Sequence, residues 1–185
     1  GGEGLAGYLA HLDRLQLDAI SQDLRRFFPE VQRISNRPLP DGNSELMFQE
    51  PATSQERSAF LSSALHISDG RLRVLALIAQ CYSAKSLILL DEIENGIYPG
   101  LAEKLIDYVR ERARESGKQF WITTHNPLIL NYLPDDVATE SIYLVRRGKL
   151  AETSAEPYFS SDLTRDKLRY MGPGEVFLDT QLELS

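Results

Sequence analysis

The chain has 185 residues, of which 42% are hydrophobic and 25% are charged. This length predicts one domain with a real core and excludes two full-sized domains, and the composition is that of ordinary soluble proteins. The formal net charge of −7 excludes a surface that is basic overall, although a local basic patch stays open.

Cys81 is the single cysteine of the sequence, so no internal disulfide can form. This favours a reducing compartment, and we expect a cytoplasmic location with Cys81 as a core residue. No apolar run approaches the length of a membrane span, and the Gly1-Gly2-Glu3 start lacks the features of a signal peptide. We therefore expect no membrane partner.

Helical spacing of apolar residues over Leu5–Phe28 predicts two helices, or one helix bent near Leu17-Asp18, within an N-terminal helical segment at 1–34. Within the segment from 35 to 66, turn-forming residues dominate Ser35–Pro51, for which we expect loop broken by a short strand at Leu46–Gln49. Thr53–Leu65 is expected to be an irregular strand or loop.

A helix is predicted to begin at Ile67-Ser68-Asp69-Gly70, where Ser68 is a good N-cap residue. The unpaired N–H groups and the positive dipole of a helix start attract anions, and Gly70 would let a phosphate approach the backbone. A capped core helix without a ligand is the plainer alternative. The residues predicted to share one face of the helix are Leu72, Leu75, Ala76 and Ala79.

The apolar run Leu87–Leu90 predicts a strand buried on both faces, and Asp91 and Glu92 follow it directly. In a parallel sheet this end borders the ligand crevice. Two adjacent carboxylates suit Mg²⁺, which takes oxygen ligands and bridges a carboxylate to a phosphate, while the second acid can accept a proton from water. A solvated acidic turn is the alternative.

A turn at Glu94-Asn95-Gly96 precedes a helix that we expect to start at Pro99 and to end at Gly117. The sequence Lys118–Thr124 then predicts a short strand. It ends at Thr124-His125-Asn126-Pro127, which would place His125 at the same edge of the sheet as Asp91 and Glu92.

The C-terminal part, 134–185, predicts a hairpin with strands at Ser141–Val145 and Leu150–Thr153 and a basic tip that could meet DNA phosphates, although a solvated turn is the better interpretation. A short helix at Asp162–Arg169 and a turn followed by an apolar closing segment at Met171–Phe177 complete the chain.

Three segments, in this order, resemble motifs of ABC-type ATPases, especially RecF-like, SMC-like and OLD-like AAA/ABC proteins. ISDGRLRVLALIA at Ile67–Ala79 resembles their signature motif, LILLDEIENGIYP at Leu87–Pro99 resembles Walker B with the D-loop, and FWITTHNPLIL at Phe120–Leu130 resembles the switch-histidine segment. The resemblance implies an α/β fold, part of a P-loop NTPase head, with a largely parallel sheet flanked by helices. The core with the signature, Walker B, D-loop and switch-histidine segments would be 67–133.

The resemblance also implies ATP and Mg²⁺ as cofactors and hydrolysis of a phosphoric anhydride. Asp91 would help hold the metal, Glu92 would polarise the attacking water and His125 would contact the γ-phosphate. Ser68 and Gly70, with Asn95 and Gly96, would contact the nucleotide site of a second head in a homodimer. Asp69 would belong to the same site, with the partner backbone or the helix start as its alternative contact, because an acid beside a phosphate is unfavourable. Asp69 and Arg71 stand where Gly and Gln are common in the signature motif.

The phosphate-binding loop GxxxxGK[ST] does not occur in the sequence. We therefore expect that a P-loop-bearing N-terminal lobe, in the same or another polypeptide, completes the head, and that this chain alone is inactive. By resemblance, the head would serve DNA repair, DNA processing or antiphage defence, with DNA or an effector nuclease subunit as further partners. Two alternatives stay open: a non-enzymatic interaction lobe, and a metal-dependent nuclease built from Asp91, Glu92, Glu94 and His125.

Overall fold

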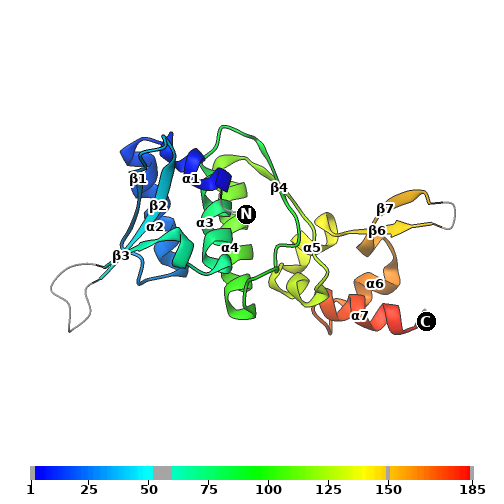
Figure 1. Cartoon of the computed structure of the whole chain (residues 1–185). Coiled ribbons are helices and arrows are strands. Elements are labelled where there is room, and N and C mark those ends of the chain that lie inside the picture. Colours follow the sequence, from blue (N-terminus) through cyan, green and yellow to red (C-terminus); the bar gives the residue numbers. More distant parts are fainter. Residues whose placement is uncertain (1–2, 52–59, 149–150, 184–185) are drawn as a thin grey trace. The chain divides into compact units, whose positions relative to one another are not determined.

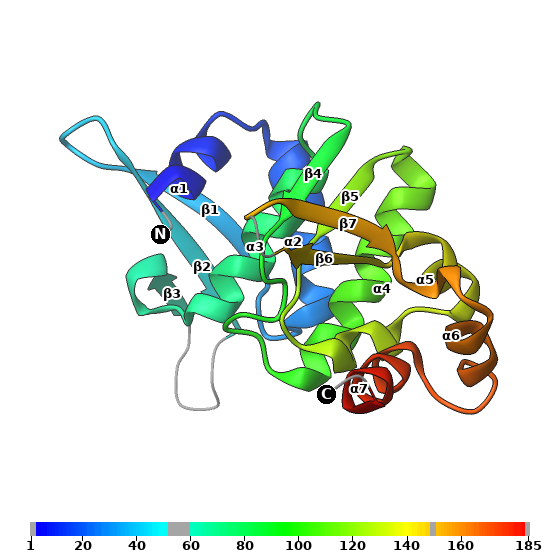
Figure 2. The same cartoon turned by 90° about the vertical axis from the view of Figure 1, so that its right-hand side faces the viewer.

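The computed structural model describes residues 3–51, 60–148 and 151–183. They form two compact units, one made of Gly1–Leu90 with Asn95–Trp121 and the other of Asp91–Glu94 with Ile122–Ser185. Figures 1 and 2 show the elements of each unit. Among the described helices, none is long and apolar enough to cross a membrane.

The first unit contains most of the helical mass and a three-stranded sheet. Its elements are α1 (Glu3–Ala10), α2 (Arg14–Phe27), β1 (Arg33–Pro38), β2 (Ser44–Glu50), β3 (Phe60–Ser63), the 3-10 turn η1 (Ala64–His66), α3 (Asp69–Cys81), β4 (Leu87–Leu90), α4 (Pro99–Ser116) and β5 (Gln119–Ile122), whose last residue is counted with the second unit.

The second unit is assembled from short elements. They are the 3-10 segment η2 (Pro127–Tyr132), α5 (Asp135–Ser141), β6 (Tyr143–Arg147), β7 (Thr153–Pro157), the 3-10 turn η3 (Tyr158–Ser160), α6 (Asp162–Lys167) and α7 (Pro173–Glu183).

The N-terminal helices are two, as one of the sequence alternatives has it, and they are separated just before Asp13. The other alternative, one helix bent near Leu17-Asp18, is wrong. Asp13 accepts a hydrogen bond from the backbone N–H of Gln16, and the Gln16 side chain accepts one from Asp13 N–H. This reciprocal capping box gives α2 a defined start. Helical periodicity alone did not locate it.

In the segment after α2, β1, β2 and β3 form an antiparallel sheet in that order. The predicted short strand is part of β2, β3 lies where an irregular strand or loop was expected, and β1 was not predicted. Ile34 and Phe48, register partners in β1 and β2, are fully buried. Gly42 supplies the positive φ of +84° that the connecting turn needs. Pro38 is tolerated because it ends an edge strand. Residues 52–59 of this segment lie outside the described part of the chain.

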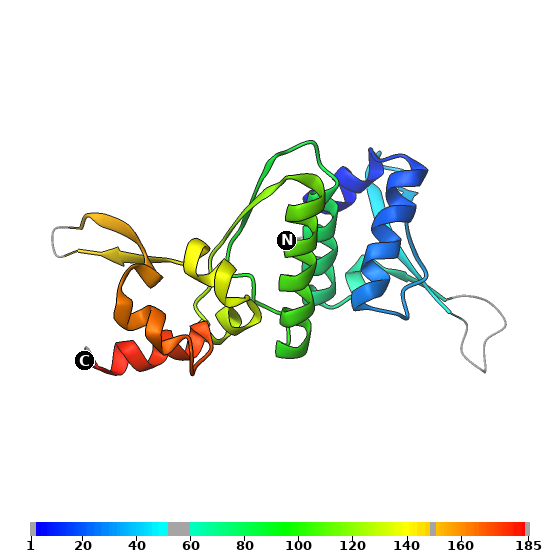
Figure 3. The same cartoon turned by 180° about the vertical axis from the view of Figure 1, so that it is seen from behind.

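Strands β4 and β5 are neighbours, and α4 connects them, which is the connection that parallel strands require. The molecule is thus α/β with a partly parallel sheet arrangement. The expectation that β4 is buried on both faces is wrong for this chain: Ile88 is buried, but Leu89 is 68% exposed, and Trp121 of β5 is 67% exposed. Helices α3 and α4, which run side by side in Figures 1 and 3, both bury apolar residues in this unit.

Helix α4 begins with Pro99 as its first residue and ends at Gly117, which adopts the left-handed conformation with φ +64°, as predicted. Its buried residue Tyr108 donates a hydrogen bond of 2.7 Å to Asp23 of α2, and Tyr82 donates to the same oxygen at 2.9 Å. Two phenols thus satisfy one buried carboxylate and join α2 to α4 and to the end of α3.

The second unit has a small core of its own around Phe159 and Val176, which are both fully buried. Strands β6 and β7 form the antiparallel hairpin that the sequence predicts, with β7 starting later than expected, at Thr153. The predicted tip residue Lys149 and the predicted first residue of the second strand, Leu150, lie outside the described residues. The apolar closing segment is helical, as part of α7.

Replacing Tyr108 with phenylalanine should lower the free energy of unfolding by about 1.5–3 kcal/mol, because a buried carboxylate loses a donor. Urea denaturation measures this. Tyr98→Phe is the matched control, since the Tyr98 side chain is exposed, and equal stability of the two variants would contradict the role given to Asp23.

Stability should also fall at alkaline pH. Burial raises the pKa of Cys81 from 9.0 to about 11, so the folded state keeps a thiol where the unfolded state already carries a thiolate. This contribution is complete below about pH 9 and is lost as the pH rises through about 11. Urea midpoints across that range should drop less steeply for Cys81→Ala than for the wild type; parallel curves would contradict the assignment.

Candidate functional site

The acidic pair at the end of β4 is held by Thr123, which follows β5. The Thr123 hydroxyl donates to Asp91 Oδ1 at 2.5 Å and accepts from Glu92 N–H at 2.9 Å. The backbone adds a bond of 3.2 Å from Ile93 N–H to the Thr123 carbonyl. One side chain therefore fixes both the carboxylate of Asp91 and the backbone position of Glu92.

Glu92 adopts a positive φ of +46°, which is uncommon for a residue with a side chain. Such a conformation costs free energy and persists only where neighbouring contacts impose it. Here the bond from Glu92 N–H to Thr123 is such a contact. In this conformation the half-buried carboxylate of Glu92 faces His125, whose Nε2 lies 3.4 Å from Glu92 Oε1.

His125 presents its ring to solvent, with 84% of the side chain exposed. Its backbone, by contrast, is fixed: Glu94 Oε1 accepts from His125 N–H at 2.7 Å and from Asn126 N–H at 3.2 Å. The imidazole is thus accessible to a ligand while the chain that carries it is anchored.

Glu94 remains a carboxylate in this arrangement. Burial alone would raise its pKa, but hydrogen bonds from its own backbone N–H, from His125 N–H, from the Thr124 side chain and from Asn126 N–H outweigh burial and hold the pKa below its usual value. The negative charge of Glu94 therefore persists at neutral pH and keeps the histidine segment in place.

Sequence reasoning missed the contribution of Thr123 and the anchoring role of Glu94. In the sequence, Thr123 is simply a threonine at the end of a strand, and Glu94 is simply a third acid two residues after the pair. No periodicity specifies which side chain reaches which backbone group, so these contacts appear only in the folded structure.

The donor set fits Mg²⁺ only with help from another ligand. Among the residues that the structure describes, no group of three or more His, Cys, Asp or Glu side chains is placed to hold a metal ion. Mg²⁺ is commonly bound by one or two carboxylates together with phosphate oxygens and waters. Asp91, exposed and oriented by Thr123, matches that pattern.

The predicted signature residues lie in the first unit. Ser68 is the N-cap residue of α3, as predicted, with extended backbone, but its side chain makes no capping hydrogen bond to the helix. Ser68 and Asp69 are exposed. The buried residues of α3 are Val74, Leu75, Leu77, Ile78, Ala79 and Cys81, so the apolar face is wider than the predicted set.

Gly70 has a packing reason that the sequence did not show. A Cβ on Gly70 would lie 2.3 Å from the carbonyl oxygen of Gly96, so only glycine allows this approach. Gly96 itself has φ +71° and forms the turn with Asn95, and both residues are exposed. The start of α3 and the Asn95-Gly96 turn are therefore in direct contact within the first unit.

Arg71, which stands where the signature motif often has Gln, has a structural role. It forms ion pairs with Glu30 at 2.5 Å and Glu50 at 2.7 Å, and its guanidinium lies over the Phe28 ring. The arginine thus ties the first turn of α3 to β2 and to the end of α2.

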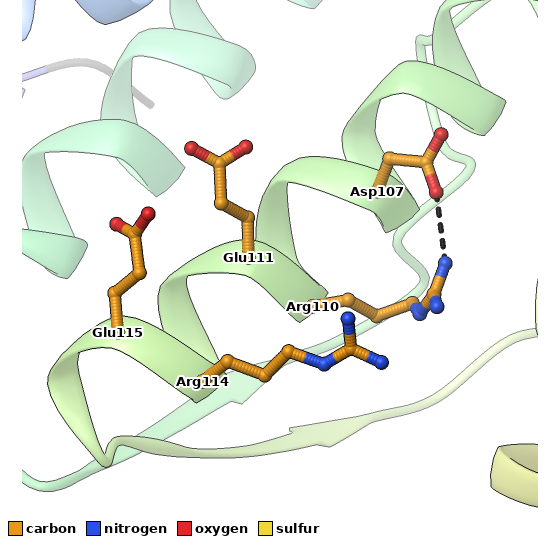
Figure 4. A pocket seen from close by; sticks show the side chains of 5 residues that line it. All are labelled: Asp107, Arg110, Glu111, Arg114 and Glu115. Atoms are coloured by element: carbon orange, nitrogen blue, oxygen red, sulfur yellow. Dashed lines mark hydrogen bonds and ion pairs between the residues drawn. The ribbon is translucent and has the colours of Figure 1, made fainter.

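A shallow depression of about 380 Å³ lies along α4 and is drawn in Figure 4. Its lining is charged on both signs, with Arg110 paired to Asp107 at 3.0 Å. All lining residues belong to one helix face, and none is a predicted site residue, so we interpret it as a solvated surface. They are Asp107, Arg110, Glu111, Arg114 and Glu115.

Three kinds of comparison relate the chain to known proteins: a curated relative, solved structures and a family model. "ABC transporter G family member 20" from Dictyostelium discoideum is 26% identical over 156 residues, which are 83% of this chain and 20% of that protein. The chain thus spans a fifth of the length of this curated relative.

Solved structures of SMC ATPase heads share the fold. A structure described under "Structural biochemistry of ATP-driven dimerization and DNA stimulated activation of SMC ATPases" has a TM-score of 0.51 and 16% identity, covering 85% of this chain and 95% of that one. The Smc head with coiled coil and joint from Pyrococcus yayanosii has a TM-score of 0.56 and 15% identity, covering 84% and 29%. The SMC head from Thermotoga maritima has a TM-score of 0.52 and 13% identity, covering 84% and 51%.

These likenesses confirm the expected fold, that of an ABC/SMC-like ATPase head within the P-loop NTPase class. A family model matches residues 6–131, more than half of the chain. The chain therefore belongs to the AAA-domain family described as "AAA domain, putative AbiEii toxin, Type IV TA system".

Proposed function

We propose that the chain is the Walker B, signature and switch-histidine half of an ATP-hydrolysing head. The observation that carries the proposal is the cluster in which Thr123 fixes Asp91 and Glu92, and His125 faces Glu92 at 3.4 Å. A metal-holding acid, a general base and an imidazole within one exposed group match the needs of phosphoric anhydride hydrolysis.

In this proposal Asp91 contributes an oxygen ligand to Mg²⁺, whose charge neutralises the phosphates when it is bound. Glu92 accepts a proton from the attacking water, and its strained backbone keeps the carboxylate at one position. His125 donates a hydrogen bond to the γ-phosphate or to that water. Because Glu94 fixes the backbone of His125, the histidine segment need not be ordered anew in each catalytic cycle.

The exposed groups of the first unit fit a contact with a second head. Ser68 offers a hydroxyl that α3 does not use as a cap, beside backbone N–H groups at the positive end of the helix dipole. Asp69, Gly70, Asn95 and Gly96 belong to the same proposed surface, where the Gly70–Gly96 contact keeps the two segments together. The SMC relative described by "ATP-driven dimerization" supports a homodimer by analogy.

The remaining partners are also proposals. A P-loop-bearing lobe would supply the phosphate cradle that the sequence lacks, so that this chain alone would not hydrolyse ATP. A cytoplasmic setting and a role in DNA repair, DNA processing or antiphage defence, with DNA or an effector nuclease subunit, follow from the family only by analogy.

The nuclease alternative is weaker than it is on sequence alone. It needs Glu94 as a metal ligand, whereas Glu94 Oε1 accepts two backbone N–H groups. The interaction-lobe alternative predicts nucleotide-dependent association without hydrolysis, and the Glu92 substitution below distinguishes it from the ATPase.

In the complete polypeptide, Glu92→Gln should keep ATP affinity and lower turnover by about 10²–10⁴-fold, the usual contribution of a general base. Phosphate release under saturating ATP measures the change. Glu156→Gln, at an exposed glutamate of β7, is the control and should leave turnover unchanged. Wild-type turnover by the Glu92 variant would refute the assignment.

Thr123→Val should raise the Mg²⁺ concentration for half-maximal turnover about tenfold, because Asp91 and Glu92 lose the hydroxyl that fixes them, a loss of about 1–1.5 kcal/mol. A Mg²⁺ titration at fixed ATP measures it. Thr123→Ser keeps the hydroxyl and should restore the wild-type midpoint; equal midpoints for valine and wild type would exclude the role of Thr123.

A further inference from the structure

Helix α7 begins within the sequence Gly172-Pro173-Gly174-Glu175. Gly172, which precedes the helix, has no side chain that could cap it. Pro173 occupies the first helical position, where its fixed φ is favourable. Glu175 reaches back and accepts from Gly172 N–H at 2.9 Å, which is half of a capping box. Glycine cannot provide the other half, so the N–H groups of the first turn need an outside acceptor.

Asn131 of η2 is that acceptor. Its Oδ1 accepts from Gly174 N–H at 2.7 Å. A side chain 43 residues earlier in the sequence therefore caps α7, and the cap joins the end of the histidine segment to the C-terminal helix.

Both glycines of the turn serve this contact. A Cβ on Gly174 would lie 2.1 Å from the carbonyl oxygen of Pro127, and a Cβ on Gly172 would lie 2.5 Å from Asn131 Oδ1. The Pro127 carbonyl is backbone and cannot give way by that amount without a shift of η2, whereas the Asn131 amide would have to rotate away from the turn that it caps. The turn is thus fitted to η2 at its beginning, Pro127, and near its end, Asn131.

Helix α7 is itself firmly placed in the second unit. Val176, one turn into the helix, is fully buried in the core with Phe159, and Lys167 of α6 pairs with Asp179 at 2.7 Å. The core therefore fixes α7, and α7 fixes η2 through the turn.

We infer that the Gly172–Glu175 turn is a positioning element for His125, acting through Asn131 and η2. The histidine segment is held from two sides, because Glu94 accepts the N–H groups of His125 and Asn126 while the turn braces Pro127–Tyr132. The catalytic consequence rests on the proposed role of His125, whereas the structural coupling does not.

The test uses the complete polypeptide with Asn131→Ala and, as the conservative variant, Asn131→Asp, which keeps an acceptor oxygen. The first readout is the NMR signal of the His125 imidazole, assigned with His125→Ala. Asn131→Ala should shift or broaden that signal and leave those of His11 and His66 in place, and Asn131→Asp should restore it. An unchanged His125 signal in Asn131→Ala would overturn the inference, whatever happens to turnover.

The second readout is a double-mutant cycle on ATP turnover. Asn131→Ala alone should lower turnover about tenfold at unchanged ATP affinity, and should have no further effect in a His125→Ala background, because interacting residues are not additive. Independent, multiplicative losses would show a general structural defect and overturn the inference. If His125→Ala retains full turnover while the NMR coupling holds, the role of His125 in the proposed function fails and the inference stands.

Gly174→Ala provides a second perturbation of the same contact, with Gly7→Ala as control, since a Cβ on Gly7 meets no atom within 4 Å. Gly174→Ala should change the His125 signal as Asn131→Ala does, and Gly7→Ala should not. A folded Gly174→Ala protein with an unaltered His125 signal would contradict the proposed bracing.

Discussion

The hydroxyl of Thr123 is the contact on which the candidate site depends. It donates to Asp91 and accepts from the Glu92 backbone, and so sets the direction of one carboxylate and permits the positive φ of the residue that carries the other. Two neighbouring acids repel each other, and a free chain would turn them apart in solvent. The neutral side chain of Thr123, at the end of the adjacent strand, holds the two acids in place against their mutual repulsion.

The histidine is held by a different principle. Its ring is left accessible, while its backbone is bound to the charged Glu94 carboxylate and, further along, to a turn whose glycines admit close backbone approach. Hydrogen bonds from backbone N–H groups to a carboxylate are among the stronger ones in proteins. Acid pair and imidazole therefore owe their geometry to residues that have no part in the proposed chemistry.

Much of this could be predicted from the sequence. The strand and acid pair at Leu87–Glu92, the helix from Pro99 to Gly117, and the strand-end position of His125 follow from short-range signals: an apolar run, a proline, a glycine and a turn. Family resemblance added the fold, which the comparison with SMC heads confirms.

The rest depends on contacts between residues far apart in the chain. Strand β1 was missed because Asn36 and Pro38 disfavour strands, and pairing with β2 together with burial of Ile34 overrides that preference. The bracing of η2 by Gly174 and the packing of Gly70 on Gly96 are equally non-local. In the sequence, Gly70 suggests room for a phosphate and Gly174 suggests a turn. In the structure, both allow a close approach of backbone that any side chain would prevent.

The bare apolar side chains of β4 and β5 have a practical consequence for anyone handling this chain. Leu89 and Trp121 are exposed on neighbouring strands of a two-stranded sheet. Surfaces of this type recruit further strands and seed precipitates. Solution work on the chain alone therefore calls for dilute samples, and aspartate or lysine at position 89 is a rational choice for improving colloidal behaviour.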